Sequence, residues 1–375
     1  MGHTTDAGMS RSAAAGMLDG ADVGASGGRA GASGAAAASE RGNASAGFVP
    51  AAASAPDAAG SGASTPAAGR AAGRLTLRMC VQLAAPHTWP AAIFPVLVAT
   101  ACATATHGGV SVVMACVLLA IAILMQAAVN TFNDYYDYVK GADSVEDNVD
   151  PSDAVLVYND VNPRAALALA IGFLAAAFAL GVYVIVQAGW IPLVIGVAGA
   201  LFVVLYSAGK TPLSYLPIGE LASGFVMGGL IVLASYQALT KDFDLRALLW
   251  ALPTIIGVGL IMMTNNTCDI EKDVEAGRHT LPVLLGRARA RRLYHALVFA
   301  WLAAIVVLVA AFFPNGLLVM VFMLLGCIPL LNALLKNPLA PAARIGAMAQ
   351  VCGLNIALGA FYAAAVFAST AALSL

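Results

Sequence analysis

Two short stretches of the sequence gather asparagine and aspartate side chains at helical spacing. In NTFNDYYDYVKGAD the residues concerned are Asn130, Asn133, Asp134 and Asp137. In NNTCDIEKDVEAGRHTL they are Asn265, Asn266, Asp269 and Asp273. Residues three and four apart lie on one face of a helix, so each stretch predicts a face of carboxylate and amide oxygens.

These oxygens indicate a metal site that handles phosphate groups. Aspartate has an unperturbed pKa of about 3.9, so two facing sets of carboxylates repel each other at neutral pH unless a cation lies between them. Mg²⁺ binds proteins through one or two carboxylates and shares its other positions with water and substrate phosphates. We therefore predict a site for Mg²⁺ and a diphosphate. Its metal ligands are predicted to be Asn133, Asp134, Asp137, Asp143, Asp269 and Asp273. Four of these are also the catalytic candidates: Asp134, Asp137, Asp269 and Asp273.

The composition indicates the elements that position these residues. The chain has 375 residues, of which 60% are hydrophobic and 10% charged, whereas a soluble domain carries about 25% charged residues. Long apolar runs predict transmembrane helices, because continuous runs do not show the alternation of a membrane β-barrel. We expect an all-α polytopic membrane protein with nine spans, built from two four-helix units plus one helix. The spans are predicted at 90–107, 110–132, 165–187, 190–207, 218–239, 246–265, 291–313, 315–335 and 343–370.

The distribution of lysine and arginine predicts the orientation. With nine spans, only Lys241 and Arg246 fall on the side opposite the N-terminus. Cytoplasmic loops carry the excess of positive residues, so the N-terminus is predicted to be cytoplasmic. The acidic stretches follow the second and sixth spans, which places both on the cytoplasmic face of a cell membrane. The sequence has no basic stripe with interleaved aromatic residues, so no nucleic-acid partner is expected.

The N-terminal segment differs from the rest of the chain. Residues 1–73 consist mainly of alanine, glycine and serine, and this composition cannot bury enough apolar surface to offset the entropy of ordering. We predict a disordered tail, followed by a membrane domain at 74–375. The six cysteines form no CxxC pair, so neither a zinc site nor a disulfide framework is expected.

The two acidic stretches resemble the aspartate-rich motifs of the UbiA-type intramembrane prenyltransferases, and most of all the 1,4-dihydroxy-2-naphthoate polyprenyltransferases of menaquinone synthesis. PHTWPAAIFPVLVATACA and YSAGKTPLSYLPIGEL resemble the same branch, and the likeness covers about residues 75 to 370. The resemblance implies a helical bundle with a central cavity and two Mg²⁺ ions that bridge a polyprenyl diphosphate. It also implies transfer of the prenyl group to an aromatic acceptor, within the lipid bilayer. The candidates for substrate binding are Lys140, Lys210, Arg278, Asn266 and Tyr206.

The sequence departs from the naphthoate branch at two expected arginines. Cys268 stands before the second-motif Asp269, and Ala85 stands before Pro86. In addition, the stretch after the first motif is acidic where a basic one is expected. A carboxylated naphthoate is expected to need cationic recognition, so these departures leave the identity of the aromatic acceptor open. Within the same family, the alternative acceptors are 4-hydroxybenzoate, haem and a glycerol phosphate. A membrane transporter is the alternative outside this family, although its charged sites would be expected near the middle of the membrane.

Overall fold

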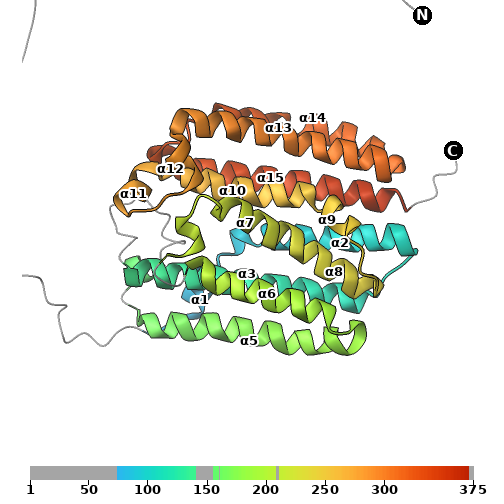
Figure 1. Cartoon of the computed structure of the whole chain (residues 1–375), viewed down its shortest axis with the longest axis horizontal. Coiled ribbons are helices and arrows are strands. Elements are labelled where there is room, and N and C mark those ends of the chain that lie inside the picture. Colours follow the sequence, from blue (N-terminus) through green and yellow to red (C-terminus); the bar gives the residue numbers. More distant parts are fainter. Residues whose placement is uncertain (1–73, 141–154, 160, 208–210, 371–375) are drawn as a thin grey trace, which may run out of the picture. The chain divides into compact units, whose positions relative to one another are not determined.

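The structure is a computed structural model, described here for residues 74–140, 155–159, 161–207 and 211–370 (Figure 1). These residues are almost entirely helical, as the apolar runs predict. The long helical segments are α2 (Pro90–His107), α3 (Val112–Lys140), α5 (Pro163–Ala188), α6 (Ile191–Ser207), α7 to α8 (Gly219–Thr240), α10 (Leu252–Cys268), α13 (Arg287–Phe312), α14 (Leu317–Lys336) and α15 (Arg344–Ala368). The short elements are α1 (Leu77–Ala84), η1 (Pro86–Thr88), α4 (Val155–Tyr158), η3 (Leu213–Tyr215), α9 (Arg246–Trp250), α11 (Ile270–Glu275), α12 (Leu281–Leu285), η5 (Pro314–Gly316) and η6 (Pro341–Ala343).

Seven helical segments among the described residues are long and apolar enough to cross a membrane. They coincide with seven of the predicted spans, so the protein is a multi-pass membrane protein. The other two predicted spans, 190–207 and 246–265, correspond to α6 and α10, which have 17 residues each. A full crossing needs about 20 apolar residues, so nine spans stay a prediction. The predicted tail at 1–73 lies outside the described residues.

The main core lies where α10 meets α2, α13 and α15. Trp301 of α13 and Tyr362 of α15 are fully buried there. Gly257 of α10 permits this close packing, because an added Cβ would lie 2.6 Å from both Trp301 and the Asn355 amide. Small residues of this kind bring membrane helices into direct backbone contact. On the other side of the bundle α3 packs along α5 and against α6.

The segment between α7 and α8 departs from regular α-helix. After α7 (Gly219–Ser223), residues Gly224–Leu230 form the π-helix η4, and α8 continues from Ile231 to Thr240. Gly224 and Gly228 lie directly against the α10 backbone, where an added Cβ would come within 2.5 Å of Ile255 atoms. Thr254 Oγ1 donates to the Gly228 carbonyl at 2.7 Å. π-Helical turns are uncommon and often occur at functional sites, and this one fixes the register of α7 against α10.

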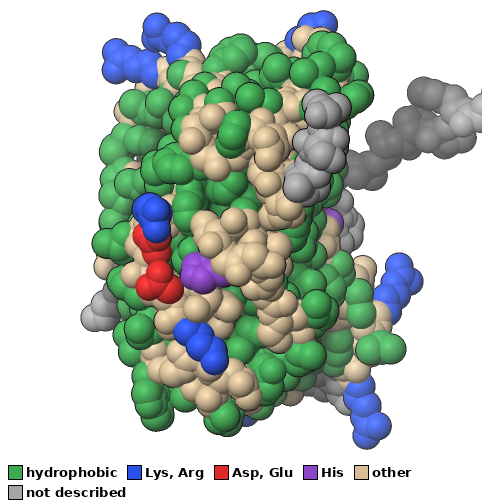
Figure 2. Space-filling view, turned by 90° about the vertical axis from the view of Figure 1, so that its right-hand side faces the viewer, with side chains coloured by type: hydrophobic (Ala, Val, Ile, Leu, Met, Phe, Trp, Pro, Cys, Tyr) green, Lys and Arg blue, Asp and Glu red, His purple; other side chains and the backbone are tan. Residues whose placement is uncertain are grey.

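The two ends of the bundle differ in chemistry. At one end, α11, which carries Asp273 of the second acidic stretch, lies with α12 near the C-terminal end of α3, which carries the first acidic stretch (Figure 1). The opposite end carries the exposed Lys241 and Arg246, and Figure 2 shows it to be mostly hydrophobic with few acidic side chains. The candidate site therefore lies at the first end.

Candidate active site at the ends of α3 and α10

The two acidic stretches meet at one arginine. Arg278 Nη2 lies 3.3 Å from Asp137 Oδ1 at the end of α3, and Arg278 Nη1 lies 3.6 Å from Asp273 Oδ1 on α11. The guanidinium also lies over the Tyr215 ring, 4.8 Å from its centroid. Burial opposes its charge, but Asp137, Asp273 and Tyr215 together outweigh that effect and raise the pKa of Arg278. The prediction that both stretches emerge at the same end of the bundle is confirmed.

The local fold after α10 explains how Arg278 reaches this position. The α10 helix ends at Cys268, and α11 makes one further turn that places Asp273 facing inward. Gly277 follows with a φ of +68°, a left-handed conformation that glycine adopts without a steric penalty. This turn brings Arg278 back, so that its N–H donates to the Asp273 carbonyl at 2.7 Å. The glycine before the arginine in EAGR is thus required by the geometry of the turn.

Asp273 is the most deeply buried carboxylate of the second stretch, with 2% of its surface exposed. Its Oδ2 accepts a hydrogen bond of 3.1 Å from Thr280 Oγ1. Burial raises the pKa of the Asp273 carboxyl to about 6, against the opposing effects of the Arg278 guanidinium and the Thr280 hydroxyl. A carboxylate that is this costly to keep ionised is a candidate cation ligand, because a bound cation would favour its charged form.

Asp269 is paired with Arg344, which is not among the predicted site residues. Arg344, the first residue of α15, donates from Nε to Asp269 Oδ2 at 2.9 Å and from Nη2 to Asn265 Oδ1 at 2.6 Å. Arg344 lies outside both acidic stretches and belongs to no motif. Its position at the start of an apolar span was the available signal. Cys268, which stands where an arginine is expected, is fully buried, so the positive charge beside Asp269 comes from a different helix.

Asp134 has a different environment from Asp137. Its Oδ2 accepts from the Val155 N–H at 2.6 Å and its Oδ1 from the Leu156 N–H at 3.2 Å. The first amides of a helix have no acceptor within the helix, and these two begin α4, so the Asp134 carboxylate caps that helix. Asn130 also binds protein groups, because its Nδ2 donates to the Ala84 carbonyl and to Thr88 Oγ1. Within this face, Asp137 reaches the second stretch, whereas Asp134 holds the chain that returns after the acidic segment.

The remaining predicted residues have varied positions. Asn266 Nδ2 donates to Glu220 Oε1 at 2.8 Å. Tyr206 is buried and lies within electrostatic range of Glu220, Arg278 and Asp137. Asn133 is half-buried on α3. Lys140 is the last residue of α3, and its side chain lies outside the described part, as do Asp143 and Lys210.

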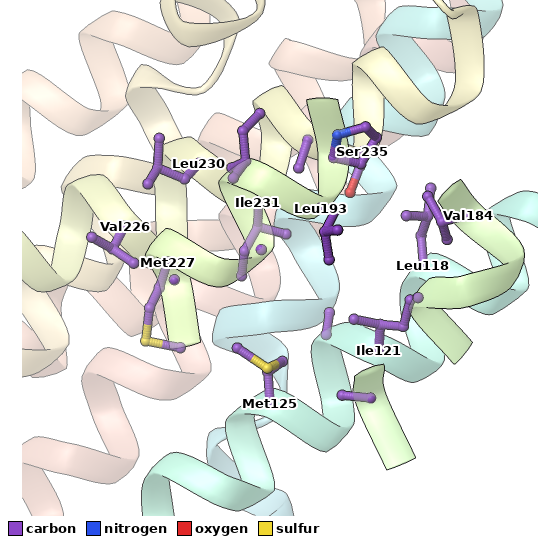
Figure 3. Close-up of a pocket in the computed structure, with 18 of the residues that line it drawn as sticks. Leu118, Ile121, Met125, Val184, Leu193, Val226, Met227, Leu230, Ile231 and Ser235 are labelled. Atoms are coloured by element: carbon purple, nitrogen blue, oxygen red, sulfur yellow. The ribbon is translucent and has the colours of Figure 1, made fainter. Parts of the chain in front are cut away.

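An apolar cavity of about 150 Å³ leads away from this end between α3, α5, α6 and the η4–α8 segment. Met125, Leu193, Met227 and Ile231 are among the side chains that line it (Figure 3). Along α3 its wall runs from Val129 to Leu118, a distance of about 16 Å at 1.5 Å per residue. Phe202 also lines it and packs on Tyr206, with 5.4 Å between the ring centroids. A hydrocarbon chain could therefore lie in the cavity with its head at the acidic end.

Comparison with known proteins agrees with this geometry. Residues 92–349 match the UbiA prenyltransferase family. The chain belongs to this family. It is 35% identical over 233 residues to the 1,4-dihydroxy-2-naphthoate octaprenyltransferase of Bacillus subtilis, a match that covers 61% of this chain and 74% of that protein. It is 34% identical to the Mycobacterium tuberculosis protein of the same name, over 58% of this chain and 73% of that one.

Solved UbiA structures share the fold. A UbiA homolog from Aeropyrum pernix K1 superposes with a TM-score of 0.56 at 20% identity, covering 73% of this chain and 96% of that one. A UbiA homolog from Archaeoglobus fulgidus, solved with GPP and Mg²⁺ bound, gives a TM-score of 0.52 at 17% identity. That match covers 77% of this chain and 99% of the other. The helical bundle of this UbiA protein therefore has the same fold as these solved structures.

The oxygen atoms at the acidic end of this UbiA chain suit a hard divalent cation. Within the described residues, no group of three or more His, Cys, Asp or Glu side chains is already gathered for a metal ion. The Arg278 guanidinium instead occupies the space between Asp137 and Asp273, and Arg344 holds Asp269. Positive side chains thus lie where a cation would, which fits Asp137, Asp269 and Asp273 as ligands. Asp134 fits less well, because both of its oxygens accept backbone N–H groups.

Proposed function

We propose that this UbiA protein transfers a polyprenyl group from a polyprenyl diphosphate to 1,4-dihydroxy-2-naphthoate, in a Mg²⁺-dependent step of menaquinone synthesis. One observation carries the proposal: a single guanidinium joins the carboxylates of both acidic stretches close to an apolar cavity. This arrangement places a site for anion and cation chemistry beside a space for hydrocarbon. The naphthoate octaprenyltransferases of similar sequence support the choice of acceptor.

The site residues have separate tasks in this proposal. Arg278 binds the diphosphate through its planar fork of donors, a geometry that suits two phosphate oxygens. Mg²⁺ would be held by Asp137, Asp269 and Asp273 and, when bound, supplies the positive charge that neutralises the leaving diphosphate. Arg344 keeps Asp269 and Asn265 in place from the start of α15. Tyr206 presents an aromatic face on which an allylic cation would be stabilised.

The cavity binds the polyprenyl chain and keeps water out. Its lining is almost wholly apolar, so a hydrocarbon tail displaces water there at a gain in free energy. Exclusion of water from the reacting end protects the allylic cation from hydrolysis. The charge distribution supports a cytoplasmic position for this end, because the sequence predicts that only Lys241 and Arg246 lie at the opposite end and that the other lysines and arginines lie at this one.

Removal of divalent cations tests the proposal most directly. We expect EDTA to lower prenyl transfer in isolated membranes at least about 10³-fold, because charge stabilisation by a metal contributes several kcal/mol, and Mg²⁺ to restore it. The measurement is the label transferred from a polyprenyl diphosphate to 1,4-dihydroxy-2-naphthoate. A rate unaffected by EDTA would contradict the metal assignment. Movement of a solute without consumption of the diphosphate would instead indicate a transporter.

The cavity assignment predicts a change in chain-length preference. Gly181 of α5 lines the cavity, and no heavy atom lies within 4 Å of an added Cβ. Gly181→Leu should therefore fill empty space without displacing a neighbour. We expect kcat/KM for long polyprenyl diphosphates to fall about tenfold or more, and the value for a short one to change less than about threefold.

The matched control for Gly181→Leu is Gly172→Leu on the same helix. Gly172 also has open space around its Cβ position, but it is exposed on the outer surface and does not line the cavity. Equal loss with long and short substrates in Gly181→Leu, or the same shift in Gly172→Leu, would show that the tail does not lie in this cavity.

A further inference from the structure

Glu220 is a buried acid that the functions assigned above do not use. It is the second residue of α7, and 5% of its surface is exposed. Its Oε1 accepts from Asn266 Nδ2 at 2.8 Å, but in the described part of the chain no donor reaches its Oε2. A buried carboxyl oxygen without a partner is costly. In a membrane protein such a group is by default a candidate functional residue.

Close packing between the segment that follows Glu220 and α10 fixes the position of Glu220. The π-helix η4 follows α7 directly, and Gly224 and Gly228 lock it onto the backbone of α10. Thr254 Oγ1 ties the Gly228 carbonyl to α10 as well. Asn266 lies on the same helix, so the contact between Glu220 and Asn266 rests on a rigid register between two elements. The position of Glu220 Oε2 is therefore fixed by the packing of α7 and η4 against α10.

The surroundings of Glu220 indicate the kind of ligand. It lies within electrostatic range of Tyr206, whose ring packs on the cavity-lining Phe202. Its partner Asn266 lies one turn of α10 before Asp269. The free oxygen thus belongs to the region between the cavity and the two acidic stretches. Oε2 is a buried acceptor that no donor of the described residues reaches, so the group that would complete it is a hydrogen-bond donor such as a hydroxyl.

We propose that Glu220 Oε2 accepts the hydroxyl proton of the aromatic acceptor and orients its ring toward the prenyl group. The inference rests on the proposed function, because it assigns a residue to the acceptor of that same reaction. The acceptor O–H bond breaks, the proton moves to Oε2, and the released electron pair enters the ring. A ring carbon then bonds to the allylic carbon as the allylic C–O bond breaks and its electrons leave with the diphosphate. The attacked carbon then loses its substituent, either as H⁺ to solvent or as CO₂, and the bonding electrons restore the aromatic ring. In both cases the proton on Glu220 returns to the ring oxygen.

Glu220→Gln separates this role from a structural one. The amide oxygen of glutamine still accepts from Asn266, but the side chain can no longer take a proton. We expect acceptor-dependent transfer to fall about 10²- to 10⁴-fold, the range of general base catalysis. Slow Mg²⁺-dependent hydrolysis of the prenyl diphosphate without acceptor should stay within about twofold of wild type. Glu275→Gln, which removes an exposed acid from α11, is the matched control and should leave both rates unchanged.

A cycle that changes both the protein and the acceptor gives the sharper test. Wild type and Glu220→Gln are each assayed with 1,4-dihydroxy-2-naphthoate and with its two monomethyl ethers. For one of the two ethers, we expect methylation to lower the transfer rate of wild type strongly. The same methylation should lower the already reduced rate of Glu220→Gln by less than about threefold, because both changes remove the same contact. The inference would be overturned if, for both ethers, the rate losses from mutation and from methylation multiplied as independent effects. It would also be overturned if Glu220→Gln lowered acceptor-free hydrolysis as much as it lowers transfer. If Glu220→Gln does not fold, Glu220→Asp enters the same cycle.

The two proposals fail in different ways. Wild-type enzyme that transfers no prenyl group to the naphthoate overturns the proposed function. In that case, calorimetric measurement of naphthoate binding to wild type and to Glu220→Gln still tests the contact between Glu220 and the naphthoate. Binding that weakens at least about tenfold in the variant supports the contact. Equal binding, or no binding to wild type, refutes it.

Discussion

Replacing Asp269 with alanine is expected to lower prenyl transfer at least about 10³-fold, and Asp137→Ala should have a similar effect. Both carboxylates belong to the set proposed to hold Mg²⁺, and the charge stabilisation that the metal supplies is worth several kcal/mol. The measurement is the steady-state rate of label transfer to the naphthoate in membranes with matched expression. Asp242→Ala, at an exposed position on the opposite end of the bundle, should retain the wild-type rate.

The isosteric change Asp269→Asn shows whether charge or shape is lost. Asparagine keeps an oxygen that can accept from Arg344, whose Nε lies 2.9 Å from the present carboxylate. The helix ends should therefore stay in place, and the thermal unfolding temperature should change little. We expect the transfer rate to fall nearly as far as in Asp269→Ala, because the negative charge is gone. Wild-type rates in Asp269→Asn would refute Asp269 as a metal ligand.

The helices were predictable because their signal is local. A continuous apolar run of about 20 residues has one stable form in lipid, since a helix satisfies all of its own backbone groups. The segment Gly219–Thr240 shows the limit of such a signal. Its apolar run predicts a helix, but the π-turn at Gly224–Leu230 depends on contacts with Ile255 on α10. No residue pattern within the run specifies that partner.

The site was predictable only in part, for a related reason. Spacing placed the carboxylates of each stretch on a helix and placed both stretches at one end of the bundle. The contact between Arg278 and Asp137 joins residues 141 positions apart, and that between Arg344 and Asp269 joins residues 75 apart. Such pairs arise from packing, so the sequence could nominate Arg278 from its motif but offered no motif for Arg344. Asp134 shows the converse, because helical spacing grouped it with Asp137 although its carboxylate caps α4.

Arg278→Ala is expected to lower kcat/KM for the prenyl diphosphate about 10²- to 10³-fold, the usual cost of removing a donor that stabilises a developing anion. Arg278→Lys should recover only part of this loss, because an ammonium group keeps the charge but not the planar fork. The KM for the aromatic acceptor should change little in both variants. Arg289→Ala provides the control, since it removes an exposed arginine near the start of α13. Equal effects on the two substrates would contradict a role in diphosphate binding.

The same variant has an opposite expected effect on the cation. Without substrate, Arg278 is the positive partner of both Asp137 and Asp273, so its charge competes with a divalent ion for the space between them. Arg278→Ala removes one positive group from beside each of the two carboxylates. Mg²⁺ alone should therefore raise the thermal unfolding temperature of Arg278→Ala more than that of wild type, while the diphosphate binds more weakly. A loss of both affinities would mean that Arg278 merely supports the fold, whereas opposite changes place the guanidinium between the metal ligands and the diphosphate.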